Sequence, residues 1–191
     1  VFMARHHPTV QVTVSRGSTE LQLTQLRERQ LDALVVDVRR VEAAPDLNVA
    51  HVVEMRAGFV CRQGHPLLGL YPEGAPFDAL LAYPIASIQL SQEVARLLVD
   101  HYGPQANPAQ MTTLQCEDIA SLLDVVGQTD AIYLGILGAA REGMARGSLA
   151  ELPMRTPLKG QARLGLITLA GRTELPAMSV FREFVQKHMT D

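Results

Sequence analysis

The sequence predicts an α/β protein with a mixed, mostly parallel sheet, and three observations lead to that prediction. Short apolar stretches with strand-like alternation are separated by stretches whose apolar residues recur at helical spacing. The segment from Val10 to Val36 contains a complete strand, turn, helix and strand. Glycines and hydroxyl side chains stand where strands are expected to pass into helices. Such alternation is typical of βαβ units, whose crossover helices cover a parallel sheet.

The first βαβ unit begins with an alternating strand over 10–14, in which every second residue is valine. Gly17-Ser18-Thr19 follows, and its hydroxyl oxygens can accept the unpaired N–H groups of a helix start. The helix then turns Leu26 inward, and a continuous apolar run predicts a buried strand over 33–38. Ligands collect at such helix starts, because the N–H groups and the helix dipole favour anionic acceptors.

Six further strands and three further helices are predicted along the rest of the chain. The strand patterns fall at 58–62, 85–88, 112–115, 131–134, 150–152 and 164–169. The helical patterns begin at Val94, Ile119 and Phe181, and each has apolar residues or histidine at i, i+3, i+4 and i+7, so each helix is expected to face a core. The stretch from Gly64 to Pro76 is rich in glycine and proline, which predicts a loop.

Composition excludes several classes of protein. The chain has 191 residues, of which 47% are hydrophobic, so it can bury a substantial core. Its net charge of −3 argues against a nucleic-acid-binding surface in this segment. No apolar run approaches the roughly 20 residues that span a bilayer, and no export signal is visible, so a cytoplasmic location without membrane contact is expected. Cys61 and Cys116 lack metal-site spacing and are expected to be reduced thiols.

No motif of an enzyme, a cofactor site or a metal site is present in the sequence. The nucleophile elbow GxSxG, the phosphate loop GxxxxGK[ST], the dinucleotide fingerprint GxGxxG and the zinc motif HExxH are all missing. His6 and His7 are adjacent but have no third ligand at usable spacing. The chain is therefore expected to be neither an enzyme nor a holder of a cofactor or metal.

Candidate ligand-binding residues stand at predicted helix starts and strand ends. Ser18 and Thr19 can contact a ligand or only cap the helix. Ser87, Gln89 and Ser91 follow a strand, where ligands of α/β sheets collect, although Ser91 is also a good N-cap. Glu117 and Asp118 suit the positive end of a helix dipole and are expected to cap it.

Arginine can anchor an acidic ligand, because a guanidinium binds carboxylate through two parallel hydrogen bonds. Arg39 follows a predicted strand and is the candidate anchor, with Arg16 and Arg62 in similar positions. Solvation at the surface is the ordinary alternative for each of the three. Walls of a ligand site would come from Ile88, Ile132 and Tyr133, for which packing in the core is the alternative.

The order of these elements resembles the effector-binding domain of LysR-type transcriptional regulators. The matching segments are Phe2 with 7–10, 17–21, Leu26 with 31–35, the GHPL-containing stretch 59–68, 124–134 and 147–153. Each segment is a common turn or apolar run, but together they cover nearly the whole chain in the family's order. The resemblance adds Thr129 to the candidate effector contacts.

The resemblance implies a two-lobed fold of the periplasmic-binding-protein type II class, with a ligand cleft between the lobes. One lobe would comprise residues 1–62 and 165–191, and the other would comprise residues 63–164. Each lobe would be a mixed, mostly parallel sheet flanked by helices. The family's first strand and its winged helix-turn-helix DNA-binding domain would precede Val1, so the chain is interpreted as an excised regulatory domain.

The implied function is to sense a small anionic metabolite and to change the oligomer geometry that controls DNA binding. The expected partners are the effector, a second copy in a homodimer and, in the full-length parent, a tetramer. DNA would be contacted only through the absent N-terminal domain. A periplasmic solute-binding protein of a transporter is the alternative, and an enzyme on the same fold is a third reading. The sequence identifies neither the effector, nor the operator, nor whether the parent activates or represses.

Overall fold

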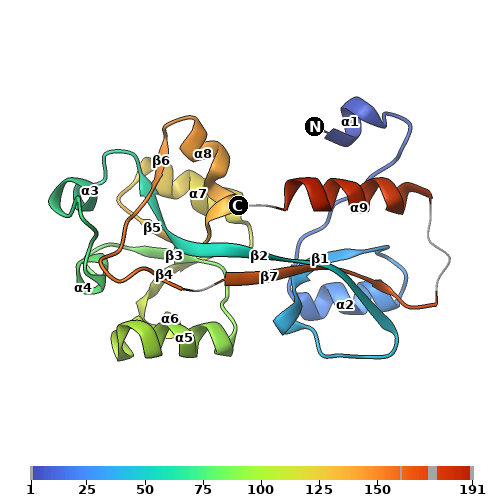
Figure 1. Cartoon of the computed structure of the whole chain (residues 1–191), viewed down its shortest axis with the longest axis horizontal. Coiled ribbons are helices and arrows are strands. Elements are labelled where there is room, and N and C mark those ends of the chain that lie inside the picture. Colours follow the sequence, from blue (N-terminus) through green and yellow to red (C-terminus); the bar gives the residue numbers. More distant parts are fainter. Residues whose placement is uncertain (1, 160, 172–175, 190–191) are drawn as a thin grey trace. The chain divides into compact units, whose positions relative to one another are not determined.

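The computed structural model describes residues 2–159, 161–171 and 176–189, and their contacts divide the chain into two compact units (Figure 1). Unit 1 comprises the described residues within Val1–Val52 and Leu164–Met189. Unit 2 comprises those within Val53–Arg163. The chain leaves unit 1 along the strand β2 (Leu47–Arg62) and returns to it along the strand β7 (Gln161–Leu169).

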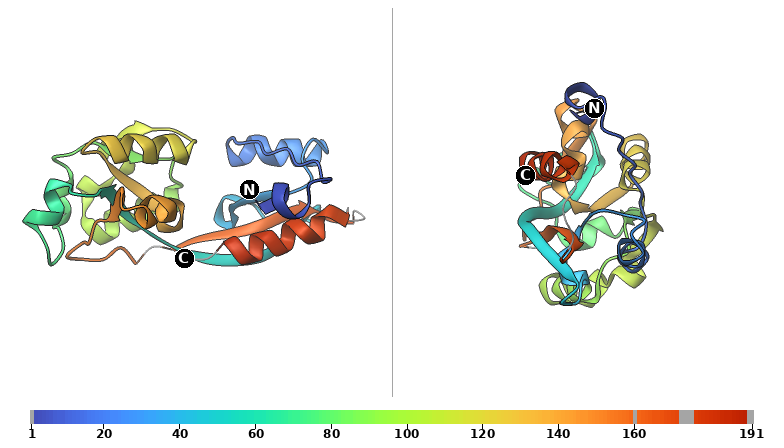
Figure 2. Two further views of the ribbon diagram at one scale, coloured as in Figure 1. Left: turned by 90° about the horizontal axis from the view of Figure 1, so that it is seen from above. Right: turned by 90° about the vertical axis from the view of Figure 1, so that its right-hand side faces the viewer.

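Unit 1 packs two helices against a narrow sheet. The strand β1 (Leu34–Asp37) pairs with β7 in antiparallel register, Val36 lying opposite Gly165. The helices α2 (Thr19–Arg27) and α9 (Pro176–His188) lie on opposite sides of these strands (Figures 1 and 2). The core on the α2 side consists of Leu26, Leu34, Val36 and Ile167. Unit 1 also contains the helix α1 (Phe2–His6) and the 3₁₀ turn η1 (Val38–Arg40).

Unit 2 is built on a mixed sheet. The strand β3 (Ile85–Ser87) pairs in parallel with β4 (Thr112–Gln115) and β5 (Ile132–Ile136). The strand β2 pairs in antiparallel fashion with β5 and with β6 (Leu149–Glu151). The hydrogen-bonded order along the open sheet is β1-β7-β2-β5-β3-β4, with β6 on β2.

The helical elements of unit 2 connect and cover these strands. They are α3 (Pro66–Leu70), α4 (Phe77–Leu80), α5 (Gln92–Tyr102), η2 (Pro104–Ala106), α6 (Pro108–Met111), α7 (Ile119–Gln128), η3 (Leu137–Ala140) and α8 (Arg141–Ala145).

Strand alternation divides the core of unit 2 between the two faces of its sheet. Phe59 and Ile132 pack on one face with Leu98 of α5. Their chain neighbours Val60 and Tyr133 pack on the other face with helix α7. Since successive side chains of a strand point to opposite faces, each strand of the sheet contributes to both clusters. The sheet of unit 2 is therefore covered by helices on both sides, as its continuous apolar strands require.

The mixed α/β fold with an open sheet is the one predicted. Most of the predicted strands form within two or three residues of their expected ends, and the strand over 112–115 matches β4. Parallel pairing is correct between β3 and its two neighbours. The pairs of β1 with β7 and of β2 with β5 and β6 are antiparallel, which makes the sheet a mixed one.

Three predictions about local structure are wrong. The stretch 10–14 is not a strand, because no strand of the described residues pairs with it, and its Val14 is 81% exposed. The predicted loop over 64–76 contains α3, because Pro66 fixes the first helical residue and His65 Nδ1 accepts a hydrogen bond from Leu67 N at 3.2 Å. Leu97 was expected to face the core from α5 but is 45% exposed.

Candidate functional site

The first turn of α2 in unit 1 combines a capped helix start with a largely buried threonine. Ser18 is the N-cap, and its Oγ accepts a hydrogen bond from Leu21 N at 3.3 Å. Thr19, the next residue, is only 5% exposed. Its hydroxyl forms no hydrogen bond with any described residue. Its oxygen is not one of the fully buried polar atoms that lack a partner, so the Thr19 hydroxyl keeps contact with solvent and has the capacity to bind a ligand at the positive end of the helix dipole.

Glu20 lies in this turn, and two arginines follow β1 in the 3₁₀ turn η1. The pKa of Glu20 is lowered by a hydrogen bond to its own backbone N–H, by a hydrogen bond with Ser18 and, to a smaller extent, by the positive charge of Arg40. Arg39 donates from Nε to Asp37 Oδ1 at 3.0 Å and from Nη2 to Asp37 Oδ2 at 2.6 Å. Because Asp37 already occupies this guanidinium fork, an effector carboxylate would have to compete for Arg39.

The carboxyl ends of β3 and β4 form a second candidate region, in unit 2. Ser87 is fully buried, and its Oγ donates a hydrogen bond to Leu134 O on β5 at 2.9 Å. Gln89 is exposed in the connection that follows. Ser91 is the N-cap of α5, and its Oγ accepts from Val94 N at 3.3 Å. The structure thus brings these three residues to one strand end, but Ser87 and Ser91 are also used in the fold.

The helix α7 begins beside this strand end. Asp118 is its N-cap and accepts a hydrogen bond from Ala120 N at 3.2 Å, as expected of an acid at a helix start. Cys116 N donates to Ser87 O at 3.3 Å, which joins the two carboxyl ends. Two helices of unit 2, α5 and α7, therefore begin at the same edge of its sheet.

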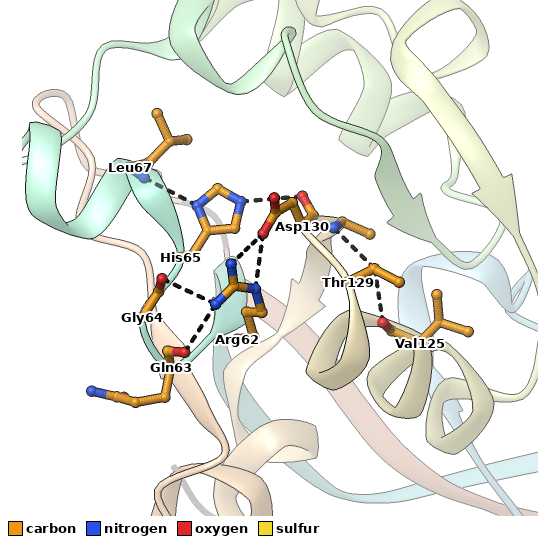
Figure 3. A network of polar contacts seen from close by, with 9 residues as sticks. Arg62, Gln63, Gly64, His65, Leu67, Val125, Thr129 and Asp130 are labelled. Atoms are coloured by element: carbon orange, nitrogen blue, oxygen red, sulfur yellow. Dashed lines mark hydrogen bonds and ion pairs between the residues drawn. The ribbon is translucent and has the colours of Figure 1, made fainter.

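Thr129 lies at the opposite edge of that sheet and does not join Ser87, Gln89 and Ser91. It precedes β5, whose first residue pairs with the first residue of β3. Its Oγ1 donates to Val125 O at 2.8 Å and accepts from Ala131 N at 3.2 Å (Figure 3). These bonds close the C-terminal end of α7, so Thr129 has a structural role there.

Figure 3 shows the polar network beside Thr129, which links the end of β2 to the start of β5. Arg62 Nε donates to Asp130 Oδ1 at 2.8 Å. His65 is 1% exposed and accepts at Nδ1 from Leu67 N, so its ring proton is on Nε2, which donates to Asp130 O at 3.1 Å. Both ring nitrogens are thereby satisfied, and the histidine holds the fold together rather than offering a reactive group.

The proposed apolar walls are mostly core residues. Ile132 is fully buried and Tyr133 is 1% exposed. Ile88 is partly buried against the α7 face of the sheet. Burial raises the pKa of Tyr133 to about 12, although a hydrogen bond from the backbone of Ile136 opposes the shift. Packing therefore explains Ile132 and Tyr133 without a ligand.

Sequence reasoning missed three residues that the structure brings together in unit 1: Val49, Val52 and Gly165. Val49 and Val52 are three positions apart on β2, so a regular strand would turn them to opposite faces. They share a face because His51, between them, has a left-handed backbone with φ of 49°. No sequence pattern marks a histidine for that conformation.

Two absences hold for the described part of the chain. No group of three or more histidine, cysteine, aspartate or glutamate side chains there is arranged to hold a metal ion. No helix there is both long and apolar enough to cross a membrane.

Comparisons with known proteins give one consistent result. The family described as LysR substrate binding domain matches residues 3–190. A relative from Pseudomonas sp. (strain ATCC 19151), the SDS degradation transcriptional activation protein, is 31% identical over 180 residues, which cover 94% of this chain and 58% of the relative. The chain therefore spans little more than half the length of that protein.

Two solved structures have the same fold. The regulatory domain of CrgA, a LysR-type transcriptional regulator from Neisseria meningitidis, matches with a TM-score of 0.70 and 13% identity, over 99% of this chain and 89% of that one. The effector-binding domain of QuiR in complex with shikimate matches with a TM-score of 0.62 and 16% identity, over 98% of this chain and 86% of that one.

Proposed function

Because this chain belongs to the LysR substrate-binding domain family, we propose that it senses a small anionic metabolite on behalf of a transcriptional regulator. The observation that carries the proposal is the hydroxyl of Thr19 at the start of α2, which forms no hydrogen bond with any described residue although the residue is only 5% exposed. A hydroxyl beside a helix N-terminus can donate to a carboxylate or phosphate, and the helix dipole favours the negative charge. Shikimate, the ligand of the QuiR domain, is itself a carboxylate at neutral pH.

The proposal includes the two lobes, residues 1–62 with 165–191 and residues 63–164. Ser18, Thr19 and Arg39 are the candidate effector contacts of the first lobe, and Ser87, Gln89 and Ser91 are those of the second. Thr129 is retained as a weaker candidate, because its hydroxyl already makes two hydrogen bonds.

The output of sensing would be a change in oligomer geometry. The effector can shift that geometry only if it binds one arrangement more tightly than the other. The proposal therefore includes a homodimer of this domain and a tetramer of the parent, working in the cytoplasm. DNA would be contacted by another domain of the parent, since the net charge of −3 does not favour phosphate binding here.

A solute-binding protein of a transporter is the rival reading with the same fold class. It is disfavoured because the matched family and the relative that is 31% identical are those of transcriptional regulators. An enzyme is disfavoured on different grounds. Ser18 and Ser91 cap helices, and Ser87 and Thr129 donate to backbone carbonyls, so these hydroxyl groups have structural roles that do not favour a nucleophile.

A thermal-shift screen of the whole chain tests the proposal. The panel contains carboxylates, amino acids and phosphorylated sugars, each with a neutral analogue. A ligand at 100 times its Kd adds about 2.7 kcal/mol, which raises the Tm by roughly 5–11 °C. Only anionic members of the panel are expected to produce this rise. A panel without any shift, or equal shifts from the neutral analogues, would contradict the proposal.

Two matched variants locate the binding group. Thr19→Val removes the hydroxyl while keeping the shape of the side chain, and it is expected to weaken anion binding by about tenfold or more, the value of a hydrogen bond to a charged group. Thr24→Val is the control, because Thr24 lies on the same helix but its hydroxyl is exposed and donates to Glu20 O at 3.1 Å. Equal affinities of the two variants would rule out Thr19 as the contact.

A further inference from the structure

Three valine side chains of unit 1 gather over a glycine. A Cβ built on Gly165 of β7 would lie 2.5 Å from Val38 Cγ1, 3.5 Å from Val49 Cγ1 and 3.5 Å from Val52 Cγ2. Val49 is 46% exposed and Val52 is 42% exposed, although both are branched aliphatic residues. We call Val38, Val49, Val52 and the backbone of Gly165 the valine floor. Val38 packs at the edge of the core beneath α2, whereas Val49 and Val52 are not part of that cluster.

The valine floor depends on an unusual backbone conformation. His51 has φ of 49°, a value that residues other than glycine seldom adopt. Like a β-bulge, this left-handed residue re-aims its neighbours, so that Val49 and Val52 point to the same face. The His51 ring reaches helix α9, where Gln186 Nε2 contacts Nδ1 at 2.8 Å. Strained residues persist where surrounding contacts hold them, and they often mark functional sites.

The floor lies next to the candidate anion site. Val38 is the first residue of η1, and Arg40, the last residue of η1, contributes to lowering the pKa of Glu20 in the first turn of α2. A short connection joins the end of α2 to the start of β1, so the helix and the strand run in opposite directions and the start of α2 lies toward the carboxyl end of β1, which Val38 follows. All of these residues belong to unit 1. An anion at the start of α2 would therefore have an aliphatic surface beside it.

We propose that the effector is an amphiphilic acid, whose anionic head binds at the start of α2 and whose aliphatic body lies on the valine floor. The inference rests on the proposed function and adds the chemical class of the effector. Gly165 allows the valines to pack onto β7, because an added Cβ there would lie 2.5 Å from Val38 Cγ1. A hydrophilic acid would leave the valines in contact with water and would gain nothing from them.

Straight-chain carboxylates of increasing length test this assignment. Butanoate, hexanoate, octanoate and decanoate are titrated into the whole chain by calorimetry, below their micelle concentrations. Each methylene that leaves water for the floor should tighten binding by about threefold to fourfold. Hexan-1-ol controls for the anionic head, and shikimate serves as a hydrophilic acid. The expected result is a Kd that falls with chain length for the acids only.

Polar variants of the valine floor show where the alkyl chain of the ligand lies. Val49→Thr and Val52→Thr keep the branched shape but add a hydroxyl, and each should reduce the gain per methylene without changing the Kd of butanoate by more than about twofold. Val35→Thr is the matched control, since Val35 is a half-exposed sheet valine (38%) whose neighbour Val36 packs on the α2 side. Circular dichroism confirms that each variant is folded.

Three results would overturn the inference. If shikimate binds but the alkanoates gain nothing with length, the effector is hydrophilic and the proposed function survives alone. If Val35→Thr removes the length dependence as strongly as the floor variants do, the aliphatic chain lies elsewhere. If the floor variants change the sedimentation coefficient of the protein and leave affinity unchanged, a second copy covers the valines. Failure of every acid, including those of the thermal-shift panel, would remove the proposed function as well.

Discussion

Cys61 and Cys116 carry the same thiol in two different surroundings. Cys61 is fully buried in β2, and burial raises its pKa to about 12; the charge of Arg62 opposes the rise and that of Asp130 adds to it. Cys116 is half-buried before α7, and its Sγ accepts a hydrogen bond from Asp118 N at 3.4 Å. Because the thiolate is the reactive form, the two cysteines should differ in reactivity.

Alkylation of the native protein checks this difference. With a pKa of about 12, only about one part in 10⁴ of Cys61 is thiolate at pH 8. Iodoacetamide is therefore expected to modify Cys116 first and Cys61 only after denaturation, as measured by peptide mass spectrometry. Cys116→Ser should leave a native protein that is almost unreactive. Equal modification of both thiols in the native state would show that Cys61 is accessible.

Hydroxyl residues illustrate what a sequence can and cannot predict at this scale. Ser18 and Ser91 each precede a helical pattern, and both form the predicted N-caps because capping needs only local geometry. Ser87 and Thr129 look equally suitable for a ligand, yet each donates to a carbonyl, Leu134 O or Val125 O. Such partners depend on how strands and helices pack, which spacing along the chain does not determine.

Helix α5 joins two regions of unit 2. Its first turn is capped by Ser91 at the carboxyl end of β3. At its other end, Tyr102 OH donates to Thr156 O at 2.9 Å, and His101 Nε2 lies 3.0 Å from Pro157 O. The Tyr102 ring stacks on Phe77 with ring centroids 4.5 Å apart. The helix therefore fixes the segment that leads from β6 into β7.

Removal of the Tyr102 hydroxyl tests this anchoring. Tyr102→Phe keeps the stacked ring but loses one donor, and it should lower the free energy of unfolding by about 0.5–1.5 kcal/mol. Amide hydrogen exchange should rise mainly over 154–158. Tyr83→Phe is the control, because the Tyr83 hydroxyl makes no hydrogen bond with any described residue. If both variants exchange alike, the bond from Tyr102 OH does not hold the segment.

Elements were predictable where their pattern was local and strong. β4 and the two helices α5 and α7 follow their apolar spacing closely. The strand expected over 10–14 did not form, although its valines alternate, because a strand also needs a hydrogen-bonded neighbour. β2 begins eleven residues before the expected Gly58. The sequence pattern missed this part of the strand because Glu54 and Arg56, which pair with charged residues of neighbouring segments, interrupt the apolar alternation.

At the scale of the whole molecule, each unit has its own hydrophobic core. Leu26, Leu34, Val36 and Ile167 form that of unit 1. The two clusters of unit 2 contain none of these residues. Leu26 is fully buried in the first core, and Leu122 is 1% exposed in one of the clusters of unit 2. Loss of either side chain should therefore act first on its own unit.

A pair of cavity variants tests the independence of the cores. Leu26→Ala and Leu122→Ala should each lower stability by about 2–5 kcal/mol, because each leaves a cavity in a packed interior. Hydrogen exchange of Leu26→Ala should rise in β1 and over 164–169 while β3 and β5 stay protected, and Leu122→Ala should give the reverse. Uniform loss of protection in both variants would mean that the two units open as one.

The return of the chain to unit 1 through β7 has a consequence for synthesis. The whole of Val53–Arg163 is continuous, so unit 2 can begin to fold on the ribosome as soon as those residues have emerged. Unit 1 cannot complete its sheet or its core before β7 has been synthesised, since β1 pairs with β7 and the core beneath α2 includes Ile167. Until translation passes residue 169, the first 52 residues are a nascent segment with exposed leucines and valines, and this segment is where a chaperone would be needed.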